Sequence, residues 1–163
     1  MTTIRHLILS ALCLFVSATA CLAQSTMPEL NDAPDVESVY ISSALIKMAS
    51  GSDSKKHTNI GGMSLKTGIL QRVTSMEVYS CESVKAATLG KRTMDKYIAS
   101  HPNIQTLISV NDGKEKVRIY ALPAEKADTY SKIIIYNYEP DEVNIVIING
   151  NMNSSDILSI SGD

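Results

Sequence analysis

Cys81 is the one residue beyond position 23 with the chemistry of a strong nucleophile. A cysteine attacks a carbonyl carbon once a base takes its proton, and His57 and His101 are the histidines that could serve as that base. Cys81 lies where an expected strand meets an expected helix, and a helix N-terminus lowers the pKa of a thiol. The alternative, a small buried apolar residue, is favoured because no catalytic motif surrounds it.

The other candidate ligands do not form a site at the level of sequence. His57 and His101 are 44 positions apart, a spacing that matches no zinc motif. His101 follows an expected helix and suits a capping role, whereas His57 lies in a polar loop. Residues 149–156 place oxygen ligands at alternate positions, but they lack the carboxylates of a calcium loop and favour a polar turn. With no phosphate-binding glycine loop or nucleophile elbow either, the sequence assigns no catalytic, cofactor-binding or metal-binding residue.

The first 23 residues have the pattern of a secretory signal peptide. Arg5 and His6 precede an apolar run over residues 7–16, and small residues follow at Ala18, Ala20 and Ala23. The run is about 10 residues long, well short of the roughly 20 that span a bilayer. The sequence therefore predicts an exported protein, periplasmic or associated with the outer membrane.

Two cleavage sites compete within this segment. Cleavage after Ala23 leaves Gln24 as the first residue of a free protein. Cleavage before Cys21 instead uses residues 18–21 as a lipobox, although a lipobox usually opens with leucine and this one opens with Ala18. A lipidated Cys21 would attach the domain to a membrane without a spanning helix, and both routes remain open.

Composition limits the classes of protein that the remaining chain can form. About 140 residues suit one domain with a real core. With Arg5 removed, 14 basic residues stand against 17 acidic ones, so no nucleic-acid partner is expected. Cys81 is left without a second cysteine for an internal disulfide, and stability must come from packing.

The first half of the domain is read from turn residues and apolar periodicity. Residues 24–35 hold two prolines without an apolar period and are predicted to be a linker. Residues 36–41 and 73–79 alternate as strands do, and a short helix capped by Ser42 extends through Ala49. Residues 51–62 favour a loop, and residues 63–70 give no clear pattern.

One substantial helix is predicted from Glu82 to Ser100, because apolar residues recur there at helical spacing before Pro102. Gly90 lies in its apolar stripe, which makes sense if the helix backbone approaches a sheet closely there.

Four consecutive strands are predicted in the second half of the chain. Residues 103–110 and 116–121 flank Asn-Asp-Gly, residues 131–138 and 143–149 flank Glu-Pro-Asp-Glu, and a short helix capped by Ser154 covers 155–160. Short connections make these strands antiparallel neighbours. The sequence thus predicts a single α+β domain over residues 36–163, with the long helix packed on a four-stranded antiparallel meander in two layers. Residues 73–79 are expected at an edge of the sheet, and the pairing of residues 36–41 is left open.

Three tyrosines of the meander are the candidate partner surface. Both faces of residues 131–138 are apolar, and the short helices look too small to cover the face away from the long helix. Tyr120, Tyr136 and Tyr138 are therefore predicted on that face, as a partly exposed patch for a partner or for self-association. The alternative is that the N-terminal segment or the short helices bury this face as a second core.

The order of these elements resembles a family of exported Bacteroidetes cell-envelope proteins whose domain has no assigned function. The resemblance rests on residues 36–42 leading into a small helix, residues 74–79 before a long helix, and a meander closing at Ile148-Asn149-Gly150. It covers most of residues 36–160 and implies an α+β envelope protein, often a lipoprotein, without a catalytic residue.

Three functions follow as hypotheses. The first is an exported accessory or binding protein of the cell envelope, without catalytic activity, whose partner is an unidentified envelope protein or a second copy. The second is a small thiol-dependent enzyme or hydrolase centred on Cys81. The third is a structural or signalling component anchored to the membrane through a lipidated Cys21.

Overall fold

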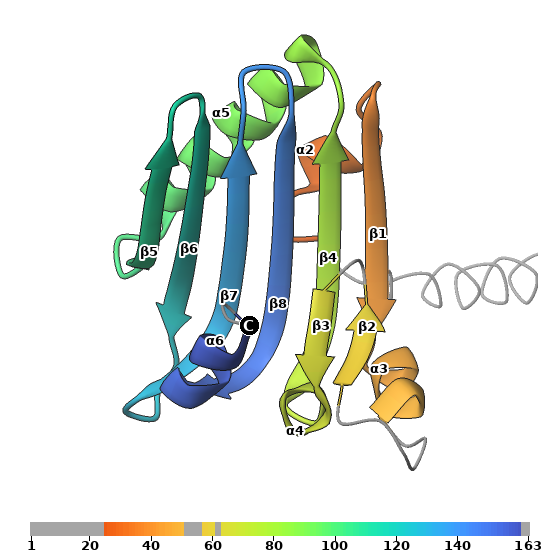
Figure 1. The fold of residues 1–163 in the computed structure, drawn as a ribbon, viewed down its shortest axis with the longest axis vertical. Coiled ribbons are helices and arrows are strands. Elements are labelled where there is room, and N and C mark those ends of the chain that lie inside the picture. Colours follow the sequence, from red (N-terminus) through yellow and green to blue (C-terminus); the bar gives the residue numbers. More distant parts are fainter. Residues whose placement is uncertain (1–24, 51–56, 61–62, 161–163) are drawn as a thin grey trace, which may run out of the picture.

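The computed structural model describes residues 25–50, 57–60 and 63–160, and its centre is a six-stranded antiparallel sheet (Figure 1). The strand order is β1-β4-β8-β7-β6-β5. The bounds are β1 Val36–Ser42, β4 Val73–Cys81, β5 Gln105–Asp112, β6 Glu115–Pro123, β7 Thr129–Tyr138 and β8 Val143–Asn153. A separate hairpin joins β2 His57–Ile60 to β3 Met63–Lys66.

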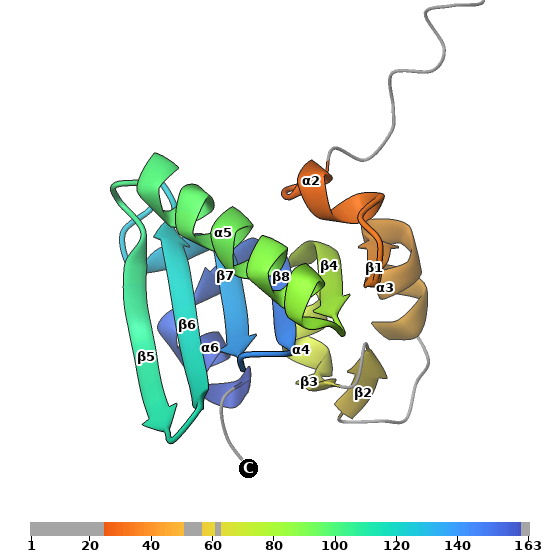
Figure 2. The same cartoon turned by 90° about the horizontal axis from the view of Figure 1, so that it is seen from above.

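Helices lie on both faces of the sheet. The long helix α5 (Val84–Ser100) crosses one face, and α2 (Pro28–Asn31) lies on the same side (Figure 2). On the opposite face are three short helices, α3 (Ser43–Ser50), α4 (Thr67–Leu70) and α6 (Ser154–Ile160). None of the described helices is long and apolar enough to cross a membrane.

The antiparallel sheet confirms the sequence prediction in part, but the expected limit of four strands is wrong. Strands β5 to β8 are consecutive neighbours, and β4 and β1 extend the sheet beyond β8. Residues 73–79 join an edge of the meander as expected, because β4 pairs with β8, and β1, whose pairing was left open, pairs with the other side of β4. Strand β4 occupies this place because its side chains are largely buried on both faces.

The long helix begins and packs as its sequence indicates. The Ser83 hydroxyl caps its first turn by accepting the backbone N–H of Ala86 at 3.2 Å. A Cβ atom at Gly90 would lie 2.9 Å from Cys81 Sγ and 3.1 Å from Val143 Cγ1. The predicted close approach of helix and sheet at Gly90 is therefore confirmed.

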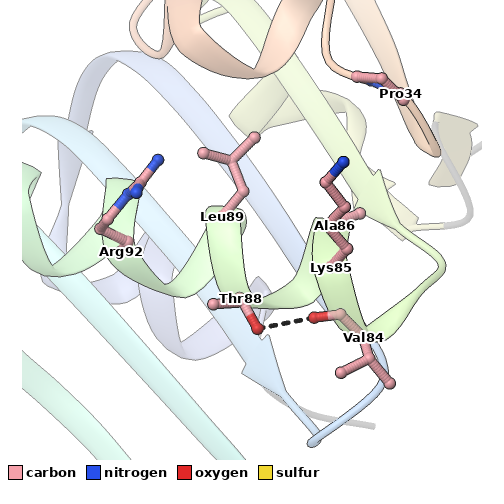
Figure 3. Close-up of a pocket in the computed structure, with 7 residues that line it drawn as sticks. All are labelled: Pro34, Val84, Lys85, Ala86, Thr88, Leu89 and Arg92. Carbon is pink, nitrogen blue, oxygen red and sulfur yellow. Dashed lines mark hydrogen bonds between the residues drawn. The ribbon is translucent and has the colours of Figure 1, made fainter.

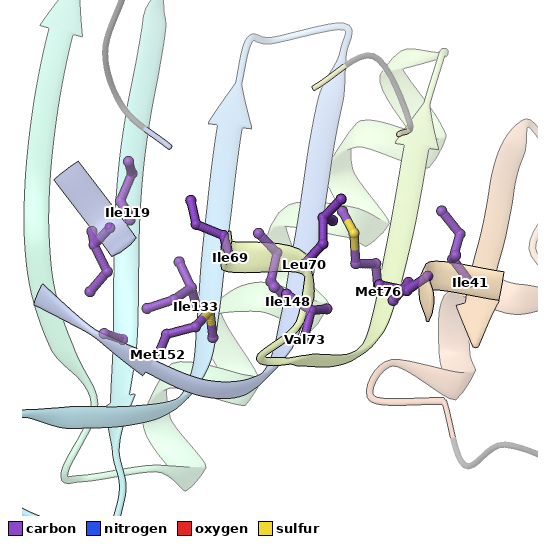
Figure 4. Packing of buried hydrophobic residues seen from close by; sticks show 12 residues of the cluster. Ile41, Ile69, Leu70, Val73, Met76, Ile119, Ile133, Ile148 and Met152 are labelled. Atoms are coloured by element: carbon purple, nitrogen blue, oxygen red, sulfur yellow. The ribbon is translucent and has the colours of Figure 1, made fainter. Parts of the chain in front are cut away.

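Each face of the sheet carries its own apolar core. The core under α5 includes Tyr79, Met94, Ile134, Ile145 and Ile147. The core on the other face, shown in Figure 4, includes Ile41, Leu70, Met76, Ile133 and Ile148. Strand alternation explains the division, because neighbouring residues such as Ile133 and Ile134 point to opposite faces.

The segment expected to be a linker is packed on the domain over its described part. Met27 and Leu30 are 1% and 0% exposed and belong to the core under α5. Pro28 begins the short helix α2, where a missing N–H costs no hydrogen bond. The sequence did not predict this packing, because two apolar side chains in a polar segment form no periodic pattern. The pockets that bury them form only in the folded domain.

Candidate functional site

The three tyrosines predicted as a partner surface lie on the face covered by α5. Tyr136 is 7% exposed within the core under α5, and Tyr120 and Tyr138 are partly buried against the same core. The predicted face is therefore wrong. The tyrosines point to the same face of the sheet as Ile134, and α5 packs on that face. Burial raises the pKa of Tyr120 above its usual value, as expected beneath a helix.

Cys81 has the environment of a structural residue. Its side chain is 0% exposed under Gly90 of α5, and burial raises the pKa of the thiol to about 11. The thiolate that a nucleophile needs is thus disfavoured despite the nearby helix N-terminus. His101 follows the C-terminal end of α5, whereas Cys81 lies near its N-terminal end. The 17 residues of the helix span about 25 Å, so His101 is too far from Cys81 to act as its base. His57 begins β2, and its side chain lies outside the described residues.

His101 instead closes the long helix, as its position in the sequence suggested. Its Nδ1 lies 2.8 Å from the carbonyl oxygen of Tyr97, and the two rings stack with centroids 4.1 Å apart. The Ser100 hydroxyl also donates to this carbonyl oxygen at 2.8 Å, so side chains satisfy a carbonyl group of the last helical turn.

We expect Cys81 to resist thiol reagents in the folded protein. At pH 8 the thiol is protonated and shielded, so labelling should occur only through unfolding and should accelerate sharply in urea. The rate of reaction with a chromogenic disulfide reagent measures this directly. Rapid labelling of the folded protein would return Cys81 to the set of candidate nucleophiles.

The stretch that superficially resembles a calcium loop is a helix cap joined to a neighbouring turn. The Asn153 side-chain oxygen accepts the backbone N–H of Asp156 at 3.0 Å, so Asn153 takes the capping place predicted for Ser154. The Asp156 carboxylate, in turn, accepts from the backbone N–H of Asn153 at 2.8 Å and pairs with Arg72 at 2.5 Å. The side-chain oxygens of Asn153 and Asp156 thus already accept hydrogen bonds from groups of the protein. Among the described residues, no group of three or more acidic, histidine or cysteine side chains could hold a metal ion.

A buried carboxylate that the sequence did not single out lies under α5. Glu77 is 3% exposed, and its two oxygens accept four hydrogen bonds. Thr26 supplies two of them, its backbone N–H at 2.7 Å and its hydroxyl at 2.6 Å. The Tyr79 hydroxyl donates at 2.8 Å and the Asn149 amide at 3.2 Å. A buried charge is tolerated when donors surround it in this way.

The Glu77 cluster holds the N-terminal segment in place. Lys132 donates to the Thr26 hydroxyl oxygen at 2.9 Å, and the Ser25 hydroxyl lies 2.6 Å from that of Tyr79. Burial lowers the pKa of Lys132, against the opposing effect of Glu77, and raises the pKa of Tyr79 to about 12. The acceptors and donors are matched within the protein, so the cluster suits attachment of this segment better than catalysis.

The other face of the sheet is covered over only part of its length. Helices α4 and α6 and the β2–β3 hairpin lie over the part that contains Ile133, Ile148 and Met152 (Figures 1 and 4). Beyond them, a row of apolar side chains crosses the sheet from β1 to β5. This open row consists of Val39, Val78, Val146, Ile135 and Ile108, with Val117 and Val110 beside it. On β6 the row is interrupted by Ile119, which is 6% exposed and belongs to the core.

Side chains in the open row are unusually accessible for a sheet face. Val39 and Val110 are 52% and 49% exposed, and the row members between them are partly exposed. Asn137 lies two residues after Ile135 on the same face, and its buried Oδ1 has no hydrogen-bond partner in the described part of the chain. An apolar row beside an unsatisfied amide is typical of a surface that a second molecule completes.

A hollow along α5 has a volume of about 570 Å³ (Figure 3). Val84, Lys85, Leu89 and Arg92 of the helix form one wall, and Pro34 contributes from across the gap. Lys85 and Arg92 are exposed, and no buried polar side chain lines the groove. The groove therefore offers no positioned acid, base or nucleophile.

Comparison with known proteins adds one finding. No curated protein and no solved structure matches the chain. A family model described as a domain of unknown function, DUF4252, matches residues 30–160, which comprise every described strand and helix except the first two residues of α2. The match confirms a family without an assigned function, and by it the chain belongs to the DUF4252 family.

Proposed function

We propose that this protein is an exported binding protein of the cell envelope that acts through contact with another protein and not by catalysis. The observation that carries the proposal is the open row, a partly exposed apolar strip on a sheet whose opposite face is covered by α5. Export is supported by the signal-peptide pattern of residues 1–23. The burial of Cys81 speaks against a thiol enzyme.

The dimensions of the open row favour an amphipathic helix as the bound element. Six strands at a spacing of about 4.8 Å span about 24 Å, which is the length of roughly 16 helical residues. On the opposite face, the 17-residue α5 crosses the sheet. A partner helix with one apolar face would thus cover the open row as α5 covers the other face.

Crosslinking in the native envelope tests this proposal. A photoreactive amino acid is placed at Ile135 in the open row, and a matched one at Val84, which is 64% exposed on α5. We expect position 135 to crosslink to one partner, with the attached peptide lying in an amphipathic helix, and position 84 not to do so. Equal crosslinking at both positions, or attachment to a segment without an apolar helical face, would contradict the proposal.

The open row should also tolerate polar substitution. We expect Val110→Asn to change the free energy of unfolding by less than about 0.5 kcal/mol, because the side chain is already half exposed. The same change should reduce partner crosslinking from position 135. Urea denaturation and crosslink yield measure the two effects, and Val84→Asn is the matched control. A large loss of stability would mean that Val110 belongs to the core.

A further inference from the structure

The two edges of the sheet differ in how they are protected against pairing with another strand. Edge strands expose unpaired backbone groups, and proteins commonly protect them with bulges, charges or covering side chains. At the β5 edge the register shifts between Thr106 and Ile108, and Arg118 donates to the carbonyl oxygen of Val110 at 2.8 Å. Its guanidinium also donates to the Asn111 side chain at 2.8 Å. The β5 edge is therefore irregular and partly capped.

The β1 edge has no register shift and no capping side chain in its described residues, and Glu37 is its one charged residue. Strand β1 pairs with β4 without a register shift from Val36 to Ser42, and it contains no proline or lysine. Four successive residues from Glu37 to Tyr40 are exposed, with Val39 at 52% and Tyr40 at 48%. A strand covered on one face alternates between buried and exposed side chains, so four exposed residues in a row show that β1 is open on both faces over this stretch.

We propose that two copies of this chain associate through their β1 strands, in antiparallel pairing that continues the sheet from one copy into the other. A two-fold axis beside Val39 sets Val39 against its own copy and Ser38 against Tyr40 of the other chain. Glu37 then faces Ile41, so the one charged residue of β1 meets no like charge. The pairing thus satisfies edge backbone groups and covers both exposed apolar side chains.

The fold leaves room for this pairing. Helix α3 follows β1 directly, lies beyond the end of that strand (Figure 1) and contacts β4. Antiparallel pairing sets the two α3 helices at opposite ends of the joined strands. The two open rows meet at Val39, so a dimer presents them end to end across the joined sheet. The pairing itself does not depend on the proposed partner, because it uses the edge of β1 and not the sheet face.

Charge exchange tests the pairing and its register. One variant carries Ser38→Lys with Tyr40→Lys, and a second carries Ser38→Glu with Tyr40→Glu. Because Ser38 faces Tyr40 of the other copy, each variant alone sets like charges opposite one another, and we expect dimerisation to weaken about tenfold or more. Mixing the two variants should restore a dimer. Sedimentation of the exported protein gives the readout, and urea denaturation checks that each variant folds.

A crosslink gives a second test that does not depend on charge. Val39→Cys should form a disulfide between copies, since paired residues across a two-fold axis lie within bonding reach. Val110→Cys is the matched control, because Val110 is similarly exposed at the β5 edge. A monomeric wild-type protein at the highest concentration reached, no rescue on mixing, or a crosslink from position 110 and not from 39 would each overturn the proposal. Failure of the partner crosslink at position 135 would leave the dimer unaffected.

Discussion

Replacing Gly150 with alanine is expected to destabilise the fold by about 3 to 4 kcal/mol. A Cβ atom there would lie 2.3 Å from the carbonyl oxygen of Arg72 and 3.0 Å from Val73 Cα. Both neighbours are backbone atoms, so the clash can be relieved only by separating β8 from the turn that precedes β4. Overpacking typically costs about 1–3 kcal/mol, and the hydrogen bond from Asn151 N–H to Arg72, 3.0 Å long, would be strained as well.

Gly90 provides the matched control for this substitution. An added Cβ would meet the side chains of Cys81 and Val143 at 2.9 and 3.1 Å, and side chains can shift where backbone cannot. Alanine also gains up to about 1 kcal/mol of helix propensity over glycine. We expect Gly90→Ala to change the free energy of unfolding by less than about 1 kcal/mol in urea denaturation. Similar losses for both glycines would contradict the difference between backbone and side-chain contacts.

The isosteric change Glu77→Gln should destabilise the protein by about 2–3 kcal/mol. Each of the two Glu77 carboxylate oxygens accepts two hydrogen bonds, and Thr26 donates one to each oxygen. An amide presents an NH₂ group in place of one oxygen, so donor faces donor inside the cluster. Hydrogen bonds to a buried charge are worth about 1.5–3 kcal/mol, and part of this is lost together with an unsatisfied group.

The Glu77 substitution should also loosen the N-terminal segment selectively. Hydrogen exchange at the Thr26 amide should quicken, because that N–H loses its acceptor. Glu29→Gln is the matched control, since Glu29 belongs to the same segment and pairs with Lys96, but both side chains are largely exposed. Breaking that pair should leave the free energy of unfolding nearly unchanged, because solvent screens the two exposed charges. Equal effects of the two substitutions would show that burial of Glu77 contributes nothing to the attachment.

Attachment of the N-terminal segment changes what lipidation of Cys21 would do. Ser25 lies four residues after Cys21 and is already held to Tyr79. Four residues reach about 14 Å at most, so a lipid on Cys21 would place the domain against the membrane without a long tether. Mass spectrometry of the mature N-terminus distinguishes a lipidated Cys21 from a free Gln24.

Local patterns in the sequence were enough to predict much of the secondary structure. The alternation of residues 131–138, the Asn-Asp-Gly turn and the helical spacing before Pro102 depend on neighbours within a few positions. Gly113 adopts φ +56° in that turn, as the turn residues predict. Gly90 belongs to the same group, because a glycine in an apolar stripe already indicates a close helix contact.

What the tertiary structure decided was how these elements combine, since this depends on contacts between distant residues. Both faces of β7 are apolar, so its sequence could not show whether Ile133 or Tyr136 faces α5. The pairing of β4 with β8 joins segments about 70 residues apart, and the pairing of β1 with β4, which the sequence left open, completes the sheet of six strands. Sockets for Met27 and Leu30 exist only once α5 lies on the sheet. The sequence by itself therefore determined the long helix, two of the short helices, the turns and the strands of the large sheet, but not α2 or α4. The register and the position of α5 determined which surface stays open and which segment is held.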